Sequence, residues 1–286
     1  MAIQATPELL RWIDEQLGRG CSPAEMIDAM VTVGHARSFA ENLIGQASGR
    51  TRVAPASGAD EAMIVNEVPE PLPAPLSSGA SSIVVDGHHV EIVVNLHHPR
   101  IVVFGNLLTS DECDALIAAS RPKLARSETV DRASGGTERN EARTSEGAYF
   151  FHDASPLLET INRRMALVTR WPLAHGEPLQ ILHYGVGAEY QPHYDYFSPD
   201  DAGTPALLAH GGQRVATLIA YLNTPSAGGA TVFPDIGLEV APIRGNAVFF
   251  AYERPDPGSR TLHGGTPVVA GEKWIATRWM REDVYA

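Results

Sequence analysis

The stretch LQILHYGVGAEYQPHYDYF, residues 179–197, is the part of the chain that best indicates its fold class. It holds two runs rich in apolar and aromatic residues with glycines between them, the pattern of two β-strands joined by a turn. Similar runs, broken by Gly, Pro and Asp, continue to the C-terminal end: RVATLIAYLNT (214–224), ATVFP (230–234), NAVFFAY (246–252), RTLHGG (260–265) and KWIATRWM (273–280). About eight strands preceded by supporting helices predict a mainly β jelly-roll barrel or sandwich.

The chain before this stretch holds further strands and helices. The run IVVDGHHVEIVV, residues 83–94, predicts a hairpin that turns at Asp86-Gly87. A capping box of Thr109 and Glu112 begins one predicted helix. Ser155-Pro156 begins another, and its apolar stripe consists of Leu158, Ile161, Met165 and Val168.

The N-terminal part differs in composition. Residues 1–46 predict a small all-α domain of three helices, the second opened by a capping box of Ser22 and Glu25 and the third running from about residue 37 to 46. Residues 47–82 are rich in Pro, Ala and Ser and predict a linker, which leaves residues 83–286 as the main domain. The helical unit is expected to act either as a stabilising or self-associating cap or as a module that recruits a partner.

Composition narrows the classes of partner. The net charge of −12 argues against nucleic acid and against an anionic membrane surface as partners. Only two cysteines occur, without CxxC spacing, which is typical of a reducing compartment. No run of 18 apolar residues and no secretory leader pattern is found, so a cytoplasmic location is expected.

His193 and Asp195 form an HxD pair within the opening stretch. Residues i and i+2 of a strand point to the same face, so these two side chains are expected to project together. Alone, such a pair is more often a surface feature than a metal site. With a third ligand it becomes the facial set of non-haem Fe(II) oxygenases. Among 11 histidines, His263 is the best candidate, because two glycines follow it and allow the backbone to approach the metal.

Lys273 opens an apolar and aromatic strand ten residues after His263. A lysine that faces into a barrel is costly unless it meets an anion, such as a cosubstrate carboxylate. The alternative is a lysine at a strand end that extends into water.

Together these motifs resemble the prolyl 4-hydroxylases, a family of 2-oxoglutarate- and Fe(II)-dependent dioxygenases, and most of all the plant and algal type and its bacterial relatives. The resemblance covers about residues 100–281 through six motifs in order: ARTSEGAYF, GEPLQILHYGVGAEYQPHYDYF, GGQRVATLIAYLN, GGATVFP, GNAVFF and LHGGTPVVAGEKWIATRWM. It implies a double-stranded β-helix, a variant of the jelly roll.

The resemblance also implies roles for individual residues. The iron ligands are His193, Asp195 and His263, and Lys273 pairs with the distal carboxylate of 2-oxoglutarate. Tyr184 and Thr217 are its hydrogen-bonding companions, and Trp279 lines the site. Contacts to the peptide substrate are implied for Arg143, Ser145, Glu177, Tyr190 and Arg214. The chain departs from the plant pattern at Thr266 and at Arg281, which is expected to alter the rim of the substrate site.

The implied reaction is hydroxylation of a proline in a peptide or protein, coupled to oxidative decarboxylation of 2-oxoglutarate to succinate and carbon dioxide. Fe(II), 2-oxoglutarate and O2 are the implied cofactor and cosubstrates, with ascorbate as an optional addition. The same mechanism on a free amino acid, another side chain or a small metabolite stays open, as does a binding module without catalysis. Residues 198–212, rich in Gly, Pro and Asp, predict either a mobile lid or merely a long loop.

Overall fold

The computed structural model describes residues 22–32, 80–138 and 142–285, together with five single positions: 13, 16, 37, 40 and 44. The chain divides into two compact units, Met1–Asn66 and Glu67–Ala286. In the first unit, α2 (Pro23–Thr32) begins after the predicted capping box, in which the backbone N–H of Ser22 donates to Glu25 and that of Glu25 donates to the Ser22 hydroxyl. The five single positions fall within the first and third predicted helices and are helical. The rest of those two helices and nearly all of the predicted linker lie outside the described residues.

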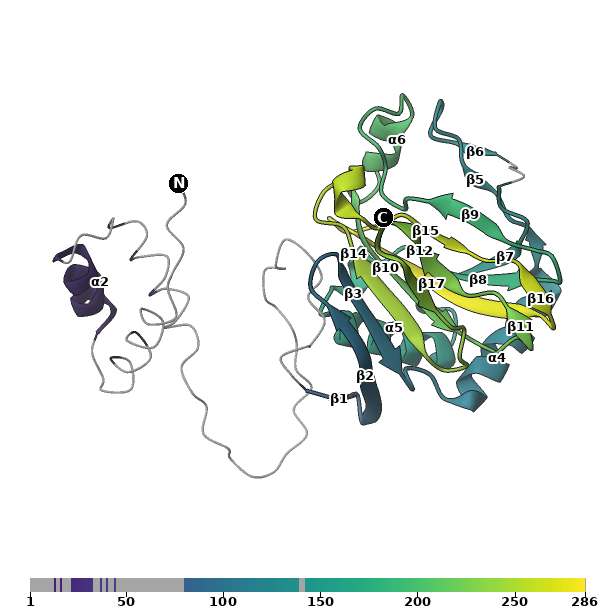
Figure 1. Ribbon diagram of the computed structural model, residues 1–286, viewed down its shortest axis with the longest axis horizontal. Coiled ribbons are helices and arrows are strands. Elements are labelled where there is room, and N and C mark those ends of the chain that lie inside the picture. The colour runs from purple at the N-terminus through teal and green to yellow at the C-terminus, as the bar shows by residue number, and fades with distance from the viewer. Residues whose placement is uncertain are drawn as a thin grey trace. The chain divides into compact units, whose positions relative to one another are not determined.

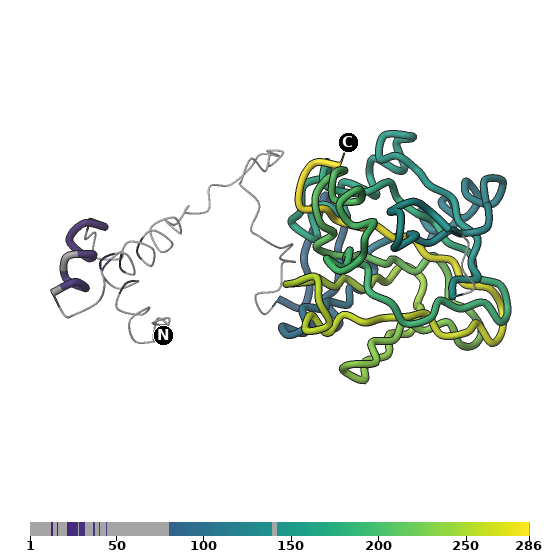
Figure 2. The backbone as a smooth tube through the Cα atoms, turned by 90° about the horizontal axis from the view of Figure 1, so that it is seen from above, coloured from purple at the N-terminus to yellow at the C-terminus, as the bar shows by residue number. Residues whose placement is uncertain are grey.

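A nine-stranded antiparallel sheet forms the frame of the second unit (Figure 1). Its strand order is β1-β2-β3-β14-β10-β17-β8-β7-β4. Its members are β1 (Ser82–Val85), β2 (His88–Leu96), β3 (Arg100–Gly105), β4 (Ala125–Arg126), β7 (Glu146–Phe150), β8 (Leu179–Tyr184), β10 (Arg214–Tyr221), β14 (Ala247–Ala251) and β17 (Lys273–Arg281). Neighbours in this order come from distant parts of the chain, so Figure 2 shows the yellow C-terminal chain running among teal and green segments.

Smaller sheets complete the unit. A four-stranded sheet in the order β13-β12-β15-β9 consists of β9 (Tyr190–His193), β12 (Thr231–Phe233), β13 (Leu238–Val240) and β15 (His263–Gly265). Two short pairs are β11 (Ala227–Gly228) with β16 (Val268–Ala270), and β5 (Thr129–Val130) with β6 (Thr137–Glu138). The unit is therefore mainly β, as predicted.

The two faces of the large sheet pack against different layers. On one face, residues such as Phe104, Leu218 and Ala276 share a core with two helices, α4 (Ser110–Ser120) and α5 (Pro156–Thr169). On the other face, residues such as Val103, Ile219 and Ile275 share a second core with Phe233 and Val240 of the small sheet. Successive residues of a strand point to opposite faces, so each central strand contributes to both cores.

Local sequence signals account for the supporting elements. The predicted hairpin turns at Asp86 and Gly87, whose φ angles of 53° and 72° suit a two-residue turn between β1 and β2. Both sides of the Thr109 and Glu112 capping box are present at the start of α4. Ser155 caps α5, whose stripe of four predicted apolar residues is fully buried. Each such side chain contributes about 1.5–3 kcal/mol to the stability of the fold. Among the described residues, no helix is long and apolar enough to cross a bilayer.

Candidate active site

Two histidines face each other where β9 and β15 pair. The register places His263 opposite His193, and their ring centres lie 4.4 Å apart. Gly264 makes this pairing possible, because a Cβ atom there would lie 2.9 Å from the carbonyl oxygen of Tyr190 on β9. The glycine was predicted to let the backbone approach a metal; its observed neighbour is the backbone of the adjacent strand.

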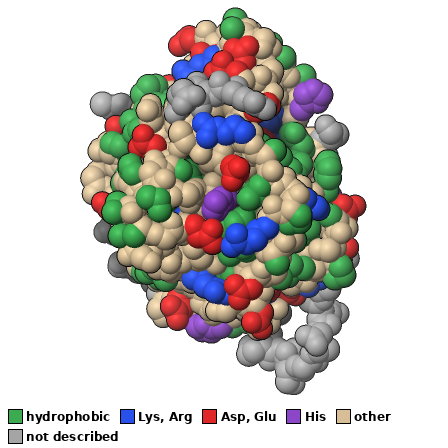
Figure 3. Space-filling model, turned by 90° about the vertical axis from the view of Figure 1, so that its right-hand side faces the viewer, with side chains coloured by type: hydrophobic (Ala, Val, Ile, Leu, Met, Phe, Trp, Pro, Cys, Tyr) green, Lys and Arg blue, Asp and Glu red, His purple; other side chains and the backbone are tan. Residues whose placement is uncertain are grey.

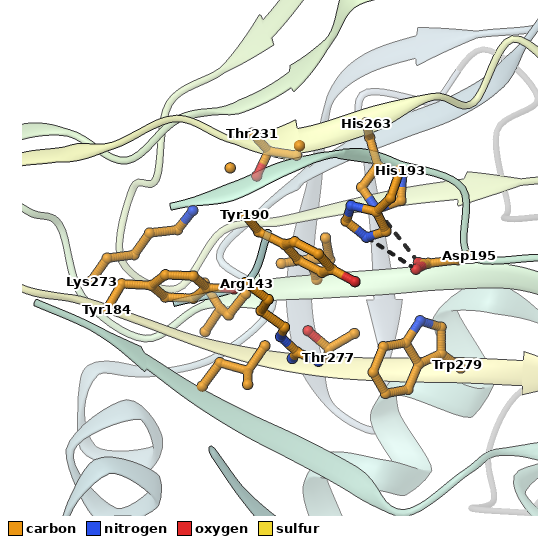
Figure 4. A pocket seen from close by; sticks show the side chains of 15 residues that line it. Arg143, Tyr184, Tyr190, His193, Asp195, Thr231, His263, Lys273, Thr277 and Trp279 are labelled. Atoms are coloured by element: carbon orange, nitrogen blue, oxygen red, sulfur yellow. Dashed lines mark ion pairs between the residues drawn. The ribbon is translucent and has the colours of Figure 1, made fainter. Parts of the chain in front are cut away.

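Asp195 completes a cluster with the two histidines (Figure 4). Its Oδ1 lies 3.4 Å from Nε2 of His193, and its Oδ2 lies 3.5 Å from Nε2 of His263. The three candidate ligand atoms all lie within 4.8 Å of one another. The two side chains were expected to converge as residues i and i+2 of one strand. Instead, β9 ends at His193 and Asp195 lies in the bend that follows. The bend still brings both side chains to the same point.

The histidine tautomers follow from their backbone contacts. Nδ1 of His193 lies 2.9 Å from the carbonyl oxygen of Gln191, and Nδ1 of His263 lies 3.0 Å from that of Thr261. A carbonyl can only accept, so each Nδ1 carries the proton and each Nε2 presents a lone pair. Burial lowers the pKa of His263 to about 4, which keeps this ring neutral.

Asp195 is held as a carboxylate. Burial raises its pKa, but a proton that enters the cluster is held on the imidazoles of His263 and His193, which keeps the pKa of the carboxyl group well below its ordinary value. When both rings are neutral, two imidazole lone pairs and a carboxylate converge on one point. Such a donor set repels itself unless a cation lies at its centre, and two nitrogens with one oxygen suit Fe(II). The residues present thus fit the metal.

The hydroxyl of Thr217 supports Asp195. It donates to Oδ2 of Asp195 at 2.7 Å and also contacts the hydroxyl of Tyr252. Thr217 was predicted to contact the cosubstrate, yet its side chain is not among those that line the cavity beside the cluster. Its observed partner is the carboxylate. The contribution of Tyr252 was not predicted, because nothing in the sequence pairs it with residue 217.

Lys273 lies at the opposite end of the same cavity (Figure 4). Its side chain is buried, with only 2% of the residue exposed, so the alternative of a lysine that extends into water is wrong. Burial lowers its pKa to about 8, and no ion pair within residues 80–138 and 142–285 offsets this shift. Its Nζ lies 5.3 Å from the ring centre of Tyr184, its partner residue in the β8–β17 register.

Hydroxyl groups and apolar side chains line the space between the two ends. Tyr184, Thr231 and Thr277 supply the hydroxyls, and the last two were not predicted. Leu182, Ile219 and Ile275 supply apolar walls. Thr231 comes from the small sheet and the other residues from the large sheet, so the cavity lies between the two sheets. Figure 3 shows one face of the molecule where a histidine and apolar side chains are ringed by charged groups.

Comparison with known proteins places the chain among its relatives. Residues 179–281 match the family profile described as "2OG-Fe(II) oxygenase superfamily". Prolyl 4-hydroxylase 5 of Arabidopsis thaliana is 39% identical over 202 residues, which cover 63% of this chain and 68% of that protein. The chain belongs to the prolyl 4-hydroxylase family. Probable prolyl 4-hydroxylase 3 of the same plant is 38% identical over 208 residues, or 65% of this chain and 71% of that one.

One solved structure is also similar to this chain. The viral collagen prolyl hydroxylase of Paramecium bursaria Chlorella virus-1, in its 2OG complex, has 29% sequence identity and a TM-score of 0.46. The match covers 63% of this chain and 95% of that chain.

Three of the five residues predicted to contact the peptide lie together beside the cavity. Arg143 and Tyr190 line it, with the guanidinium 5.0 Å from the tyrosine ring centre. Ser145 is fully buried and accepts from Nε of Arg143 at 3.2 Å, so it orients that side chain. The ring of Tyr190 also stacks on His193 with centres 3.6 Å apart.

The other two, Glu177 and Arg214, belong to a buried ion cluster with Arg281. Glu177 accepts from Nε of Arg214 at 2.7 Å and from Nη1 of Arg281 at 2.9 Å. The Arg214 guanidinium lies 4.2 Å from a ring centre of Trp279, which lines the cavity. Burial raises the pKa of Glu177, but the two guanidiniums outweigh it and hold the pKa below its usual value. The ion cluster therefore supports Trp279 from inside the fold, and a contact of Glu177 or Arg214 with the peptide stays a prediction.

Arg281 does not lie on the rim as predicted, because its side chain is buried. Its guanidinium donates to the carbonyls of Leu207 and Gly212, at 2.7 Å in both cases. These carbonyls belong to the segment 198–212, which contains the short helix α6 (Thr204–Leu208). The segment is therefore fastened to the ion cluster and is not a structureless loop. Whether it moves as a lid stays a prediction.

Proposed function

We propose that this chain is a peptidyl-proline 4-hydroxylase that uses Fe(II), 2-oxoglutarate and O2. Membership of the family supports this reaction class. The observation that carries the proposal is one cavity with three convergent metal ligands at one end and, at the other, a buried lysine that has no counter-ion among the described residues. We also propose that the two sheets around it form the double-stranded β-helix implied by the sequence.

His193, Asp195 and His263 would hold the metal. Bound there, Fe(II) would supply the redox chemistry that couples oxidative decarboxylation of 2-oxoglutarate to hydroxylation of a C–H bond. Thr217 holds one oxygen of Asp195, and backbone carbonyls hold both rings in the tautomer that can ligate. Such supporting contacts orient ligands and tune the site.

Lys273 would bind the distal carboxylate of 2-oxoglutarate. A carboxylate beside the buried ammonium replaces its lost hydration with a charge-assisted hydrogen bond. The hydroxyls of Tyr184, Thr231 and Thr277 lie along the same cavity and can donate to the cosubstrate. The apolar walls exclude water, which protects the reaction from side products.

Trp279, Tyr190 and Arg143 would bind the peptide. The indole N–H of Trp279 is buried and has no hydrogen-bond partner in the described part of the chain, so it can donate to a bound carbonyl. Arg143 and Tyr190 offer further donors and an aromatic face. The names of the curated relatives, prolyl 4-hydroxylases, support proline as the residue that is hydroxylated.

The test is hydroxylation of proline-rich peptides by the iron-loaded enzyme. Incubation with 2-oxoglutarate should add one oxygen to a proline, as measured by mass spectrometry, with one succinate formed per oxygen. Succinate formation that no peptide stimulates would sink the peptide assignment and favour a small substrate. Absence of any turnover would favour a binding module.

Two expectations stay proposals. We propose that the N-terminal helical unit, residues 1–46, acts as a cap or a recruiting module joined by the linker at 47–82. A cytoplasmic location also stays a prediction. Cell fractionation of the full chain tests the cytoplasmic location. Size-exclusion chromatography of the full chain and of a chain that lacks residues 1–46 tests self-association through the helical unit.

A further inference from the structure

Three tyrosines, Tyr252, Tyr196 and Tyr194, form a connected series that begins at a proposed iron ligand. The hydroxyl of Tyr252, which follows β14, contacts the hydroxyl of Thr217, and Thr217 donates to Oδ2 of Asp195 at 2.7 Å. Because Thr217 uses its proton on Asp195, Tyr252 is the donor in the contact between the two hydroxyls. Two hydrogen bonds in sequence therefore join the phenol of Tyr252 to the carboxylate.

The tyrosine rings continue outward from Tyr252. The ring centres of Tyr252 and Tyr196 lie 6.2 Å apart, and those of Tyr196 and Tyr194 lie 4.8 Å apart in a stacked arrangement. Exposure rises along the series, because Tyr252 is 3% exposed, Tyr196 is 8% exposed and Tyr194 is partly exposed. None of these three tyrosines lines the cavity. The series therefore connects the ligand cluster with the surface by a route outside the cavity.

A proton acceptor lies at the outer end of the series. The hydroxyl of Tyr194 is hydrogen-bonded to the carboxylate of Asp235, which belongs to η3 (Pro234–Ile236). Burial and the carboxylates of Asp235 and Asp256 raise the pKa of Tyr194, so the proton stays on the phenol at rest. A tyrosine that loses an electron also releases its phenolic proton, and a positioned carboxylate can accept it. Tyr194 is therefore the member of the series best suited to hold a neutral radical.

We infer that the three tyrosines form an electron-transfer route that restores Fe(II) when 2-oxoglutarate is consumed without a peptide. The inference rests on the proposed function, because it needs the iron site and its cosubstrates. In such a turnover, one oxygen atom of O2 enters succinate and no C–H bond receives the other. That second atom leaves as water once two electrons and two protons have been supplied.

Each electron follows the same sequence of transfers. Tyr252 gives an electron to the iron site, Tyr196 refills Tyr252, and Tyr194 refills Tyr196. Tyr252 and Tyr196 regain their protons as they are refilled, whereas the phenolic proton of Tyr194 moves to Asp235. A soluble one-electron reductant then reduces the Tyr194 radical, which takes its proton back from Asp235. Two such transfers and two protons from solvent complete the balance, and the side chains that line the cavity are spared from oxidation.

Trapping of the radical tests the route directly. The enzyme loaded with Fe(II) and 2-oxoglutarate is exposed to O2 without peptide, in the presence of 2-methyl-2-nitrosopropane, which bonds covalently to tyrosyl radicals. Electron paramagnetic resonance detects the adduct, and peptide mapping by mass spectrometry locates it. In the wild-type enzyme we expect the adduct on Tyr194. Tyr149 is the internal control, because it is 59% exposed, lies outside the series and should carry no adduct.

Tyr196→Phe interrupts the series at its middle member. The ring and its packing stay, but phenylalanine has no phenol to oxidise, so the adduct on Tyr194 should be lost. Because Tyr196 lies outside the cavity, kcat/KM for peptide hydroxylation should match that of the wild-type enzyme. Tyr149→Phe is the matched variant and should keep the adduct on Tyr194.

The remaining outcomes are also decisive. Equal labelling of Tyr194 in the wild-type enzyme and in Tyr196→Phe overturns the route, and so does equal labelling of Tyr149 and Tyr194, which indicates a diffusing oxidant. Succinate formation without any adduct, or succinate formation only when peptide is present, overturns it too and leaves the proposed function intact. Absence of succinate both with and without peptide contradicts the proposed function itself.

Discussion

Thr217 donates a hydrogen bond of 2.7 Å to Oδ2 of Asp195, and both groups are buried. The hydroxyl therefore fixes the only carboxylate of the proposed iron site from outside the cavity. Replacing Thr217 by Val keeps the shape and removes the donor. We expect iron affinity to fall by about 10- to 100-fold, the usual effect of losing such a supporting contact. Metal titration with turnover measures it, and Thr217→Ser should restore most of the loss.

Gly264→Ala should separate the two histidines. The new Cβ would lie 2.9 Å from the backbone oxygen of Tyr190, so β15 must shift away from β9. We expect weaker iron binding with a retained fold, seen as a loss of metal-dependent thermal stabilisation with an unchanged far-UV circular dichroism spectrum. Gly185→Ala is the matched control, because a Cβ there meets no atom within 4 Å. Equal iron affinity in both variants would contradict the tight pairing.

Lys273→Met should raise the free energy of unfolding and weaken the binding of 2-oxoglutarate. The pKa of Lys273 is lowered to about 8 by burial, whereas an unfolded lysine titrates near 10.5. Between these values the unfolded chain binds more protons, so the free energy of unfolding of the protein without cosubstrate rises with pH in that window. Below about pH 8, Met removes a penalty on the order of 3 kcal/mol. Denaturant titration at pH 7 and pH 10 should show the gain mainly at pH 7, while the KM for 2-oxoglutarate rises sharply.

The ion cluster of Glu177, Arg214 and Arg281 predicts which substitution within it lowers the free energy of unfolding most. Glu177→Gln leaves two buried guanidiniums without their anion, whereas Arg281→Met leaves Glu177 paired with Arg214. We expect the first to cost about 3–5 kcal/mol of unfolding free energy and the second clearly less. The pKa of Glu177 is held low in the folded state, so its stabilisation is present above the unfolded pKa and is lost as pH falls through the folded pKa. Urea titrations across the acid range test both points, and the reverse order would refute the pairing.

Much of the site could be predicted because its chemistry is local in sequence. His193 and Asp195 lie two residues apart, and the bend that follows β9 brings their side chains to one point. His263 was found from the two glycines that follow it, and Lys273 from its place as a charged residue at the start of an apolar and aromatic strand. The strands themselves followed from turn residues and alternation, and both capping boxes form as predicted.

The rest depends on strand order and register, which one sequence does not specify. Arg214 and Arg281 meet because β10 pairs with β17 in a register that sets them opposite each other. Their partner Glu177 precedes β8, the next strand in the sheet. From sequence alone, Glu177 and Arg214 were expected to contact the substrate, and Arg281 was expected to alter the rim of the substrate site. Tyr252, Thr231 and Thr277 were missed for the same reason, since each reaches the site through a strand pairing and not through a motif.

The alternation along β17 divides this strand between two tasks. Lys273, Ile275, Thr277 and Trp279 line the cavity, whereas Trp274, Ala276 and Met280 belong to the core shared with the helices. A library confined to positions 275 and 277 would therefore reshape the cavity wall without touching the helix-packed core. This strand is a natural starting point for altering which C–H bond is hydroxylated while the frame stays intact.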